Sequence, residues 1–472
     1  MNLFSSASSL AHMIRDRKIS PVEVVTEYTA HIDRKNPEIN AYVWRNDDQA
    51  LEQARAAEQK VLSGDTTQPF LGVPVPVKNL SDVAGQPNDQ CSLAMDDTPR
   101  TETDPAVQRL IDGGFTLQGR TNSPEFGPLT VSQNRKYGAT ANPWNLQRTA
   151  GGSSGGAAAA VASGMAPVAH ASDGGGSIRV PSSCCGLVGL KPSRGRIPQG
   201  VAGWEHSTTE GAITRTIEDA AGLLDVMSGP DLTAWYSAPE PAELYMYSYL
   251  RDPGSLRIGL MLSPPTGLPV DDACLEATHA AAGVLRSFGH TVVDATPRLY
   301  SPQSIEDFQI IVSAWTGAND VADESLLDTY IRERVQQGRS YDATQYAAAS
   351  ARIQLETRDI LPQWGQDFDV LLTPTMATTV PDLTVVYDEA NTASLAERTT
   401  ELRMISFTSF VNMSGQPAIS LPVHQDAEGL PVGVQLVGGA FREDVLLQLG
   451  RQLEQHFQWQ HTLASLQTGI QA

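Results

Sequence analysis

Apolar positions near the N-terminus recur with helical spacing. Residues 10–18 read LAHMIRDRK after Ser8 and Ser9, and residues 22–34 read VEVVTEYTAHIDR after Pro21. Serine is a common residue at the N-cap of a helix, and proline is common in the first helical turn. We therefore predict that residues 5–62 are mainly helical, with a serine cap before the first helix and Pro21 opening the second.

Strand patterns then alternate with helical ones along the chain. Residues 68–80, QPFLGVPVPVKNL, are apolar and β-branched, and Pro74 and Pro76 predict an edge strand or an extended connector because proline cannot donate to a β-ladder. Thr214 is a candidate cap for the helix that follows it. The further patterns predict helices over 106–114, 214–228, 272–289, much of 303–366 and 442–457, and strands over 115–119, 255–262, 290–296, 368–375, 417–423 and 432–439.

This alternation predicts an α/β fold in which helices cover both faces of a sheet. The chain has 472 residues, with no internal repeat and no low-complexity linker, so we expect a single domain. Residues 229–256 are rich in turn formers and predict a long excursion. Within residues 1–472 we distinguish N-terminal helices (1–65), a core that holds the candidate chemistry (66–228), a divergent region that builds the substrate pocket (229–410), and closing strands with a helix (411–472).

Composition narrows the classes of function. Hydrophobic residues make up 41% and charged residues 18%, which is typical of a globular enzyme, and the net charge of −21 disfavours nucleic-acid binding. No apolar stretch is long enough for a membrane helix or a signal peptide, so we expect a cytoplasmic protein without a membrane partner. The four cysteines match neither a disulfide framework nor a zinc pattern, and we interpret them as buried apolar residues: Cys91, Cys184, Cys185 and Cys274.

Two glycine clusters, each with a serine, dominate residues 151–179, which read GGSSGGAAAAVASGMAPVAHASDGGGSIR. Glycine is used where backbone takes a positive φ or lies close to another group. The small residues between the clusters predict a helix that is packed tightly on all sides. A turn, a buried helix, a short strand and a second turn would bring Ser153 and Ser177 to one end, where two hydroxyls could act on a carbonyl.

Lys78 is the candidate base for these hydroxyls. Lysine is scarce, with six in the chain and none after residue 191, and Lys78 follows the apolar run LGVPVPV. Burial favours the neutral amine, which accepts a proton. A solvated surface lysine is the competing interpretation, as a flexible capping turn is for each serine cluster.

The second glycine cluster has the features of an oxyanion hole. Gly174, Gly175 and Gly176 can direct successive N–H groups, together with that of Ser177, at one point. Asp173 and Arg179 flank this cluster, and we interpret them as a buried ion pair that braces the loop. A carboxylate in direct contact with the reacting atoms would oppose the negative charge that develops there.

These strings resemble the signature of the amidase signature family of serine amidohydrolases. The resemblance extends in order over roughly the whole chain, through GVPVPVKNL, GRTNSPEFG, YGATANPWN, the glycine clusters, TRTIEDAAGLLDVMSGP, DVLLTPT and NMSGQPAISLPV…GLPVGVQLVG. It implies the family's fold, a large mixed central β-sheet covered by helices on both faces. The overall layout is closer to stand-alone bacterial amidases, among them hydrolases of cyclic nylon oligomers.

The resemblance also implies roles for individual residues. Ser177 matches the family's nucleophile, Ser153 the bridging serine that follows a cis peptide bond after Gly152, and Lys78 the general base. Ser154 matches a supporting hydrogen-bonding position. The implied reaction is cleavage of a carbon–nitrogen bond through a covalent acyl-enzyme, with ester cleavage as a side activity.

Two positions depart from the family pattern. Gly174 stands where the family commonly has threonine or another side chain, and we expect this glycine to loosen the loop and widen the site beside the oxyanion hole. Arg120 stands where the family often has lysine, which we interpret as a surface-type change without catalytic consequence.

Three other functions compete with this interpretation. Gly151, Ser153 and Gly155 satisfy G-x-S-x-G, the nucleophile elbow of Ser-His-Asp α/β-hydrolases, which needs a histidine downstream; the candidates are His290, His424 and His456. The family also includes the glutaminase component of a tRNA-dependent amidotransferase, but residues 306–322 do not resemble its characteristic stretch. A nucleotide-binding module is disfavoured because neither GxGxxG nor a Walker pattern occurs.

The substrate pocket is expected from the divergent segments 200–250 and 300–410. Its candidate wall residues, each of which could equally be plain core, are Trp204, Phe308, Trp315 and Phe410. The absence of lysine beyond residue 191 favours a small, neutral, fairly apolar amide, linear or cyclic. We expect no metal and no cofactor, and a homodimer if the chain associates.

Overall fold

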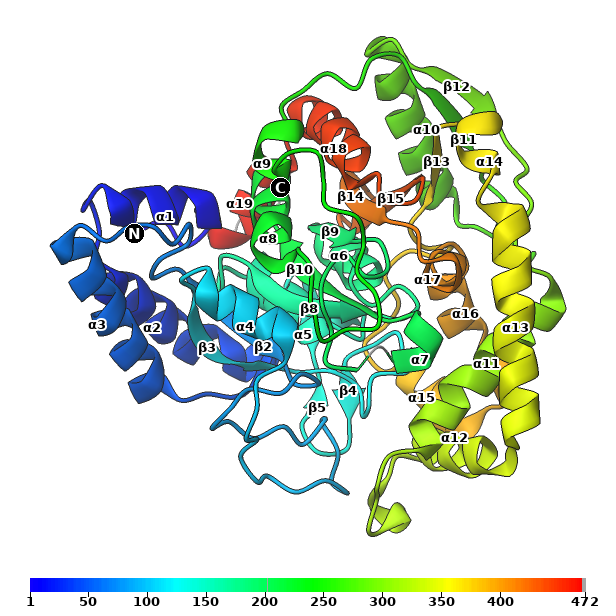
Figure 1. The fold of residues 1–472 in the computed structure, drawn as a ribbon, viewed down its shortest axis with the longest axis horizontal. Helices are drawn as coiled ribbons and strands as arrows, with labels where there is room; N and C mark the ends of the chain where they lie inside the picture. The colour runs from blue at the N-terminus through cyan, green and yellow to red at the C-terminus, as the bar shows by residue number, and fades with distance from the viewer. Residues whose placement is uncertain (202, 469–472) are drawn as a thin grey trace.

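Two β-sheets, visible together in Figure 1, organise the computed structural model, which describes residues 1–201 and 203–468. The larger sheet has eight strands in the order β12-β11-β13-β15-β14-β9-β10-β8. Its β11 pairs in parallel with β12 and β13, whereas every other neighbouring pair is antiparallel. The sheet is therefore mixed, as expected. Its strands are β8 (Ala169–Asp173), β9 (Val188–Lys191), β10 (Thr209–Thr214), β11 (Arg257–Leu260), β12 (Thr291–Asp294), β13 (Val370–Pro374), β14 (Ala418–Gln425) and β15 (Pro431–Gly438).

The smaller sheet has three strands in the order β1-β3-β2 and lies at the N-terminal end of the molecule. Its β2 is an edge strand, which agrees with the two prolines in it. This edge packs against β8, the edge of the larger sheet. The elements of this part are α1 (Ala7–Arg15), α2 (Pro21–Ile39), β1 (Tyr42–Trp44), α3 (Asp47–Ser63), β2 (Pro74–Lys78), α4 (Pro105–Asp112) and β3 (Thr116–Thr121).

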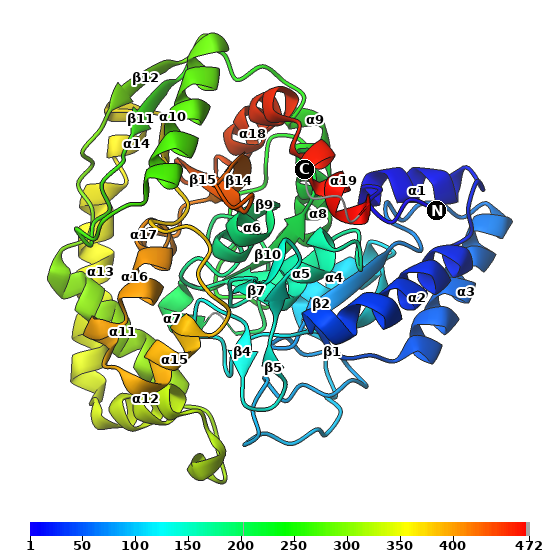
Figure 2. The same ribbon diagram turned by 180° about the vertical axis from the view of Figure 1, so that it is seen from behind.

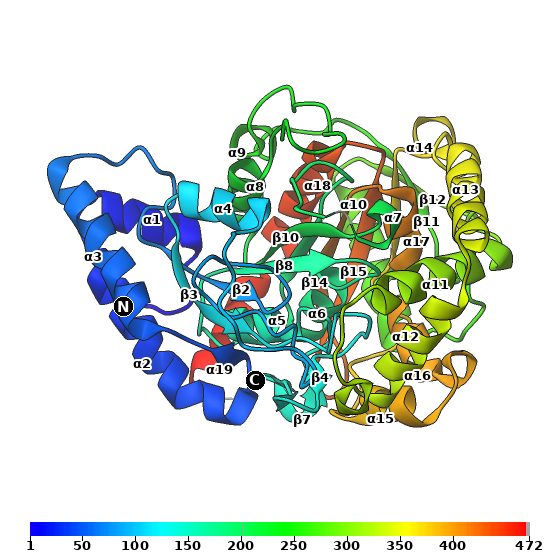
Figure 3. The same ribbon diagram turned by 60° about the horizontal axis from the view of Figure 1, so that its bottom comes forward.

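Helices cover both faces of the larger sheet, as the alternation predicted. One face packs against α8 (Ile217–Met227), α10 (Asp272–Ser287) and α18 (Glu443–Phe457), and the other against α5 (Gly155–Ala162) and α6 (Arg179–Cys185). Figure 3 shows α5 and α6 in front of the sheet and α18 behind it. Short elements complete this part, namely β4 (Gln133–Asn134), β5 (Gly138–Ala139), β6 (Ala141–Asn142), β7 (Asn145–Thr149), α7 (Gly203–His206), α9 (Tyr245–Ser248) and α19 (Trp459–Thr468).

A third group of helices forms a wall along the side of the molecule away from the N-terminus, seen in Figure 1 and from behind in Figure 2. It comes mainly from the divergent region, which the sequence predicted to be largely helical over 303–366. Its members are α11 (Pro302–Gly317), η1 (Glu324–Leu326), α12 (Thr329–Ser340), α13 (Ala343–Ile360), α14 (Gln363–Gln366), α15 (Val385–Thr392), η2 (Leu395–Glu397), α16 (Thr399–Ile405) and α17 (Ser409–Ser414).

Helix α5 is buried on all sides, as its composition predicted, because every one of its eight residues is buried. A Cβ added to Gly156 would lie 2.4 Å from the backbone nitrogen of Asn122 and 2.7 Å from the carbonyl oxygen of Ala41. Only glycine allows the helix to approach the backbone of the smaller sheet this closely. This packing fixes the direction in which α5 presents its N-terminus, where the first serine cluster lies.

Several local predictions are wrong in detail. The cap of α1 is Ser6, whose Oγ accepts a hydrogen bond from the N–H of Ser9, whereas Ser8 lies inside the helix and its Oγ donates to Asp219. The cap of α8 is Thr216 and not Thr214, which ends β10. Each error is a shift of two or three residues, because neighbouring serines and threonines compete for the same role.

Arg120 contradicts the expectation of a surface-type change. Its side chain is fully buried in β3, its Nε donates to Asn79 Oδ1 at 2.6 Å, and its Nη2 donates to the carbonyl oxygen of Ser81. It therefore fixes the chain immediately after Lys78. The four cysteines are free and buried, as expected. Across residues 1–201 and 203–468, no helix is both long and apolar enough to cross a membrane.

Candidate active site

Lys78 ends β2 at the line where the two sheets meet. Its Nζ lies 2.7 Å from Ser153 Oγ, 3.0 Å from Ser172 Oγ and 3.4 Å from the carbonyl oxygen of Ser172 on β8. The side chain is 1% exposed. The amine is thus held by neutral oxygen atoms in a dry environment, and no carboxylate pairs with it directly among the described residues.

Burial lowers the pKa of Lys78 to about 8, although the negative charges of Glu210 and Asp173 act in the opposite direction. Removing the ammonium from water disfavours its charged form more than these two carboxylates restore it. A larger fraction of Lys78 is therefore neutral near pH 7 than of an ordinary lysine. The amine can accept a proton from a hydroxyl in contact with it.

The first serine cluster is held by backbone contacts. The Gly152–Ser153 peptide bond is cis, as the resemblance implied. A Cβ on Gly152 would lie 2.6–2.8 Å from the backbone of Val131, so this position has no room for a side chain. Ser132 Oγ donates to the carbonyl oxygen of Ser153 at 2.9 Å and accepts from the N–H of Gly155 at 2.8 Å.

Ser177 lies between β8 and α6, in the second cluster. It is half-buried and lines a mainly apolar pocket, together with Gly152. The N–H of Ser154 donates to the carbonyl oxygen of Ser177 at 3.2 Å, and Ser154 Oγ donates to the carbonyl oxygen of Ser172 at 3.1 Å. Ser154 therefore links the backbones of the two serine loops, consistent with its expected supporting role.

The four expected oxyanion donors are not equivalent. The N–H of Gly176 donates to Asp173 Oδ1 at 2.8 Å, so it is already committed and does not fit the role expected for it. The N–H groups of Gly174, Gly175 and Ser177 have no hydrogen-bond acceptor among the residues that the structure describes. Of these three residues, Gly175 and Ser177 line the pocket and Gly174 does not. These two amides are the available donors for a negatively charged oxygen.

Asp173 and Arg179 form the buried brace that the sequence predicted. Both are fully buried, and the Arg179 Nε and Nη2 atoms donate to the two carboxylate oxygens at 3.0 and 2.9 Å. Burial alone would raise the pKa of Asp173, but Arg179 holds it well below its usual range. Arg179 also donates to Gln435 and Asn412, which ties the second serine loop to the C-terminal strands and to α17.

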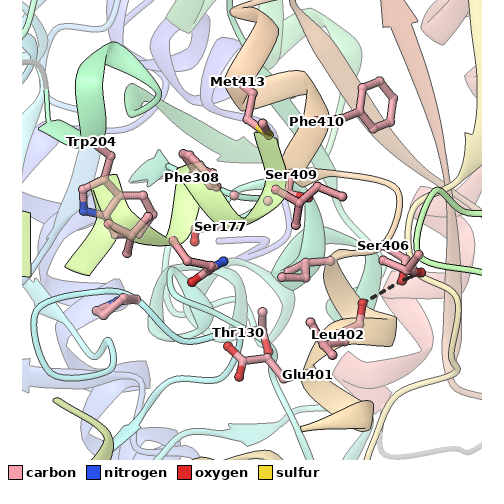
Figure 4. Close-up of a pocket in the computed structure, with 18 of the residues that line it drawn as sticks. Thr130, Ser177, Trp204, Phe308, Glu401, Leu402, Ser406, Ser409, Phe410 and Met413 are labelled. Carbon is pink, nitrogen blue, oxygen red and sulfur yellow. Dashed lines mark hydrogen bonds between the residues drawn. The ribbon is translucent and has the colours of Figure 1, made fainter. Parts of the chain in front are cut away.

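The pocket is mainly apolar, and Figure 4 shows the labelled side chains arranged around Ser177. Of the predicted wall residues, Trp204, Phe308 and Phe410 line it. Trp315 does not: it lines a second cavity, and its Nε1 donates to Tyr346. Further lining residues that sequence reasoning missed include Leu129, Ile305, Val312, Met413 and the buried Arg334 and Glu401.

The expectation that Gly174 widens the site is wrong. A Cβ on Gly174 would lie 2.6 Å from the indole of Trp204 and 3.3 Å from Thr208. The space that a side chain would occupy is taken by the tryptophan. Pattern matching could identify the missing side chain at 174 but could not show which distant residue packs there.

Ser172 and Ser132 are site residues that the sequence analysis did not single out. Ser172 lies on β8 two residues after His170, and alternate residues of a strand face the same side. The backbone N–H of Lys78 donates to His170 Nδ1 at 3.4 Å, and Lys78 Nζ contacts Ser172 Oγ, so this alternation is the signal that could have identified Ser172. Ser132 had no comparable signal, because a lone serine in a loop is usually a turn residue.

The histidines proposed for a Ser-His-Asp hydrolase lie elsewhere. His290 contacts Gln452 at 2.8 Å, His424 lies 3.7 Å from Glu276, and the ring of His456 packs against Phe457. Within the described part of the chain, no histidine lines the pocket that contains Ser177. The group in contact with Ser153 is an amine and not an imidazole.

Comparisons with known proteins give the family. The model of the amidase family matches residues 23–447. The 6-aminohexanoate-cyclic-dimer hydrolase of Pseudomonas sp. (strain NK87) is 35% identical, and the match covers 97% of this chain and 96% of that protein. The structure of a 6-aminohexanoate cyclic dimer hydrolase complexed with substrate superposes with a TM-score of 0.92 at 32% identity, covering 98% of both chains.

The likeness extends to a protein with a different role. One component of the Glutamyl-tRNA(Gln) amidotransferase of Picosynechococcus sp. (strain ATCC 27264 / PCC 7002 / PR-6) is 32% identical, with 96% of this chain and 98% of that protein covered. All three relatives match nearly from end to end. The chain therefore belongs to the amidase family, and it is an enzyme that acts on carbon–nitrogen bonds.

Proposed function

We propose that the chain hydrolyses amides through a Ser177–Ser153–Lys78 relay and a covalent acyl-enzyme. The observation that carries this proposal is the 2.7 Å contact between the buried Lys78 amine and Ser153 Oγ, beside a pocket that contains Ser177. A weak nucleophile such as serine needs an adjacent base. Lys78 meets this need because burial lowers its pKa to about 8.

The first half-reaction forms the acyl-enzyme. Lys78 accepts the proton of Ser153, which takes the proton of Ser177 as its Oγ forms a bond to the amide carbonyl carbon. The carbonyl oxygen becomes negatively charged and receives hydrogen bonds from the N–H groups of Gly175 and Ser177. Each such donor contributes roughly 3–4 kcal/mol to stabilising the transition state.

The second half-reaction reverses the path of the proton. The C–N bond breaks while the proton returns from Lys78 through Ser153 to the leaving nitrogen, because an amine leaves poorly as an anion. Water then transfers a proton to the same relay and attacks the acyl carbon, which releases the acid and restores Ser177. Esters should react as well, since their leaving group departs more easily.

The substrates that we propose are small, neutral and fairly apolar amides, linear or cyclic. The walls supplied by Phe308, Phe410 and Met413 support an apolar substrate. The relative that acts on the cyclic dimer of 6-aminohexanoate supports a cyclic one. A cytoplasmic location and a homodimer belong to the same proposal, which includes neither a nucleic-acid nor a membrane partner.

The second candidate is the glutaminase component of a tRNA-dependent amidotransferase, which the amidotransferase relative supports. Free glutamine is charged at its α-amino and α-carboxyl groups, whereas most of the pocket wall is apolar. The two candidates are separated by comparing hydrolysis of glutamine with that of an anilide and a cyclic amide by the isolated chain. Hydrolysis of glutamine alone would favour the amidotransferase role.

The test of the relay uses a sulfonyl fluoride and mass spectrometry. We expect phenylmethanesulfonyl fluoride to add one sulfonyl group, mapped to Ser177, and to abolish anilide hydrolysis. Ser177→Ala should lose the adduct and reduce kcat by roughly a million-fold, a magnitude typical of a deleted serine nucleophile. Changing His290, His424 and His456 to alanine in turn is the control and should leave acylation unchanged. An adduct on another residue would contradict the proposal.

A further inference from the structure

Trp204 occupies an unusual position in the wall of the catalytic pocket. It follows Gly203 in α7, and three successive residues there have left-handed backbone: Trp204 (φ 52°), Glu205 (φ 50°) and His206 (φ 63°). Such φ values are uncommon for residues with side chains. A run of three therefore indicates that contacts around the segment, and not local preference, hold it in place.

The first of these contacts is with the second serine loop. The indole lies in the space that a side chain at Gly174 would fill, with Cζ3 of the ring 2.6 Å from the position of an added Cβ. The ring also meets Phe308 of α11 edge to face, with 6.4 Å between the centroids. Trp204 thus packs between the serine loop and the helical wall. Figure 4 shows its side chain at one side of the pocket.

The second set of contacts holds the segment from behind. The Glu205 carboxylate accepts hydrogen bonds from Tyr346 Oη at 2.5 Å and from Ser350 Oγ at 2.8 Å, both on α13. The carbonyl oxygen of His206 accepts from Arg194 Nε at 2.6 Å. These hydrogen bonds hold Glu205 and His206, which follow Trp204 directly, and so keep the indole in one position.

A second cavity lies on the other side of this segment. Glu205 and His206 line it, whereas Trp204 lines the catalytic pocket. The remaining walls include Trp235, Tyr236 and Trp315, and the side chain of Trp235 is exposed, so this cavity opens to solvent. Helix α11 spans both spaces, because Phe308 lines the catalytic pocket and Trp315, two turns further on, lines the second cavity.

We propose that Trp204 is a specificity-determining residue that separates the catalytic pocket from the second cavity and so limits the length of the amide that the enzyme accepts. The inference rests on the proposed function, since it concerns the substrate that reaches Ser177. It assigns a purpose to Gly174: the absent side chain makes room for the ring. Without the indole, the aromatic walls of the second cavity would become an extension of the apolar pocket.

The experiment compares two reagents that differ only in length, methanesulfonyl fluoride and dodecanesulfonyl fluoride. With each, the Ser177 oxygen forms a bond to sulfur, the S–F bond breaks, fluoride leaves and the Oγ proton passes to the relay. The intact-protein mass follows the fraction of modified enzyme with time and gives a second-order rate constant for each reagent. The quantity compared is the rate constant for the long reagent divided by that for the short reagent. Because the short reagent reports the reactivity of Ser177, the ratio isolates the effect of length.

We expect Trp204→Ala and Trp204→Leu to raise this ratio at least about tenfold, the discrimination that steric restriction of an apolar pocket typically provides. Gly174→Thr should raise it in the same direction, because the new side chain displaces the ring. Phe410→Ala is the matched control: it removes an aromatic ring from the same pocket but leaves Trp204 and its contact with Phe308 in place, and it should change the ratio less than about threefold. Trp204→Phe should keep it near the wild-type value.

An unchanged ratio in Trp204→Leu, with the adduct still on Ser177, would overturn the inference and leave the proposed function standing. A ratio raised equally by Phe410→Ala would also overturn it, because general loosening of the pocket would then explain the gain. Absence of any Ser177 adduct in the wild-type protein would contradict the proposed function and, with it, this inference. Far-UV circular dichroism identifies variants that remain folded.

Discussion

The core that holds the two serines (residues 66–228) and the divergent region (residues 229–410) use glycine in different ways. In residues 66–228, a Cβ at Gly152 or Gly156 would overlap the backbone of a neighbouring strand or loop. In residues 229–410, a Cβ at Gly267 or Gly283 would meet nothing within 4 Å; Gly317 and Gly338, where α11 and α12 cross, are exceptions. The first serine loop and the helix that follows it are therefore positioned by close contacts between backbones, which several glycines of the divergent region lack.

This difference predicts that chemistry depends on the first region and substrate preference on the second. A change of a reacting group in the core should remove activity whatever the substrate. A change of a wall residue should alter the choice among substrates. Replacing glycine by alanine tests the same contrast through the free energy of unfolding, which should fall in the first region and rise in the second.

Short of removing the nucleophile itself, the largest effect should come from Lys78→Met, which keeps the apolar stem and removes the amine. We expect kcat/KM for an anilide to fall by about 10³, in the range typical of a lost general base. In the wild-type protein, only the neutral amine accepts a proton and the pKa of Lys78 is about 8. The value of kcat/KM should therefore rise with pH up to about 8 and then level, and it should fall as Lys78 becomes protonated at lower pH.

Phe410→Ala, in the apolar wall, is the control for this profile. It should alter KM and the preference among amides without moving the pH midpoint, because Phe410 carries no proton. Survival of the alkaline rise in kcat/KM in Lys78→Met would show that another group is the base. It would also break the assignment of chemistry to the junction of the two sheets.

A smaller effect, on stability, is expected from Gly156→Ala. Its Cβ would lie 2.4 Å from the backbone nitrogen of Asn122, and this atom belongs to a buried backbone that cannot move aside freely. Overpacking of this kind costs about 1–3 kcal/mol of the free energy of unfolding. Chemical denaturation should show a lower midpoint with little change in slope. A midpoint equal to that of the wild type would mean that the helix can shift without cost.

The smallest effect is expected from Gly283→Ala, the same substitution in the divergent region. Gly283 lies within α10, is exposed, and has open space where a Cβ would be. Alanine in an exposed helix interior is more stable than glycine by roughly 0.5–1 kcal/mol. The denaturation midpoint should therefore rise slightly. A loss of stability here would remove the contrast between the regions.

The sequence predicted those parts of the fold that depend on local pattern. The buried helix between the serine clusters, the edge strand with two prolines and the Asp173–Arg179 brace were predicted because small residues, proline and opposite charges that flank a glycine cluster have local meanings. The order of the strands could not be predicted. Strand β9 pairs with the nearby β10 on one side and, on the other, with β14, which is more than 200 residues away in sequence, and no local pattern specifies such a pairing.

The errors in the site have the same origin. Trp315 and Phe308 are both aromatic residues of α11, and only the packing of α7 between them decides which pocket each one lines. Arg120 is buried because Asn79 and the carbonyl oxygen of Ser81 surround its guanidinium, which composition alone does not reveal. The commitment of the Gly176 N–H to Asp173 likewise depends on the turn geometry of one loop.

The position of Lys78 at the junction of two sheets has a consequence for how the chain acquires activity. The amine belongs to the small sheet, whereas Ser153 precedes α5 and Ser177 lies between β8 and α6, on the side of the large sheet. During refolding, a molecule whose two sheets have formed but not yet docked would contain every reacting side chain and still be inert. Recovery of hydrolysis should then lag behind recovery of secondary structure, so the return of activity would mark the docking of the two sheets.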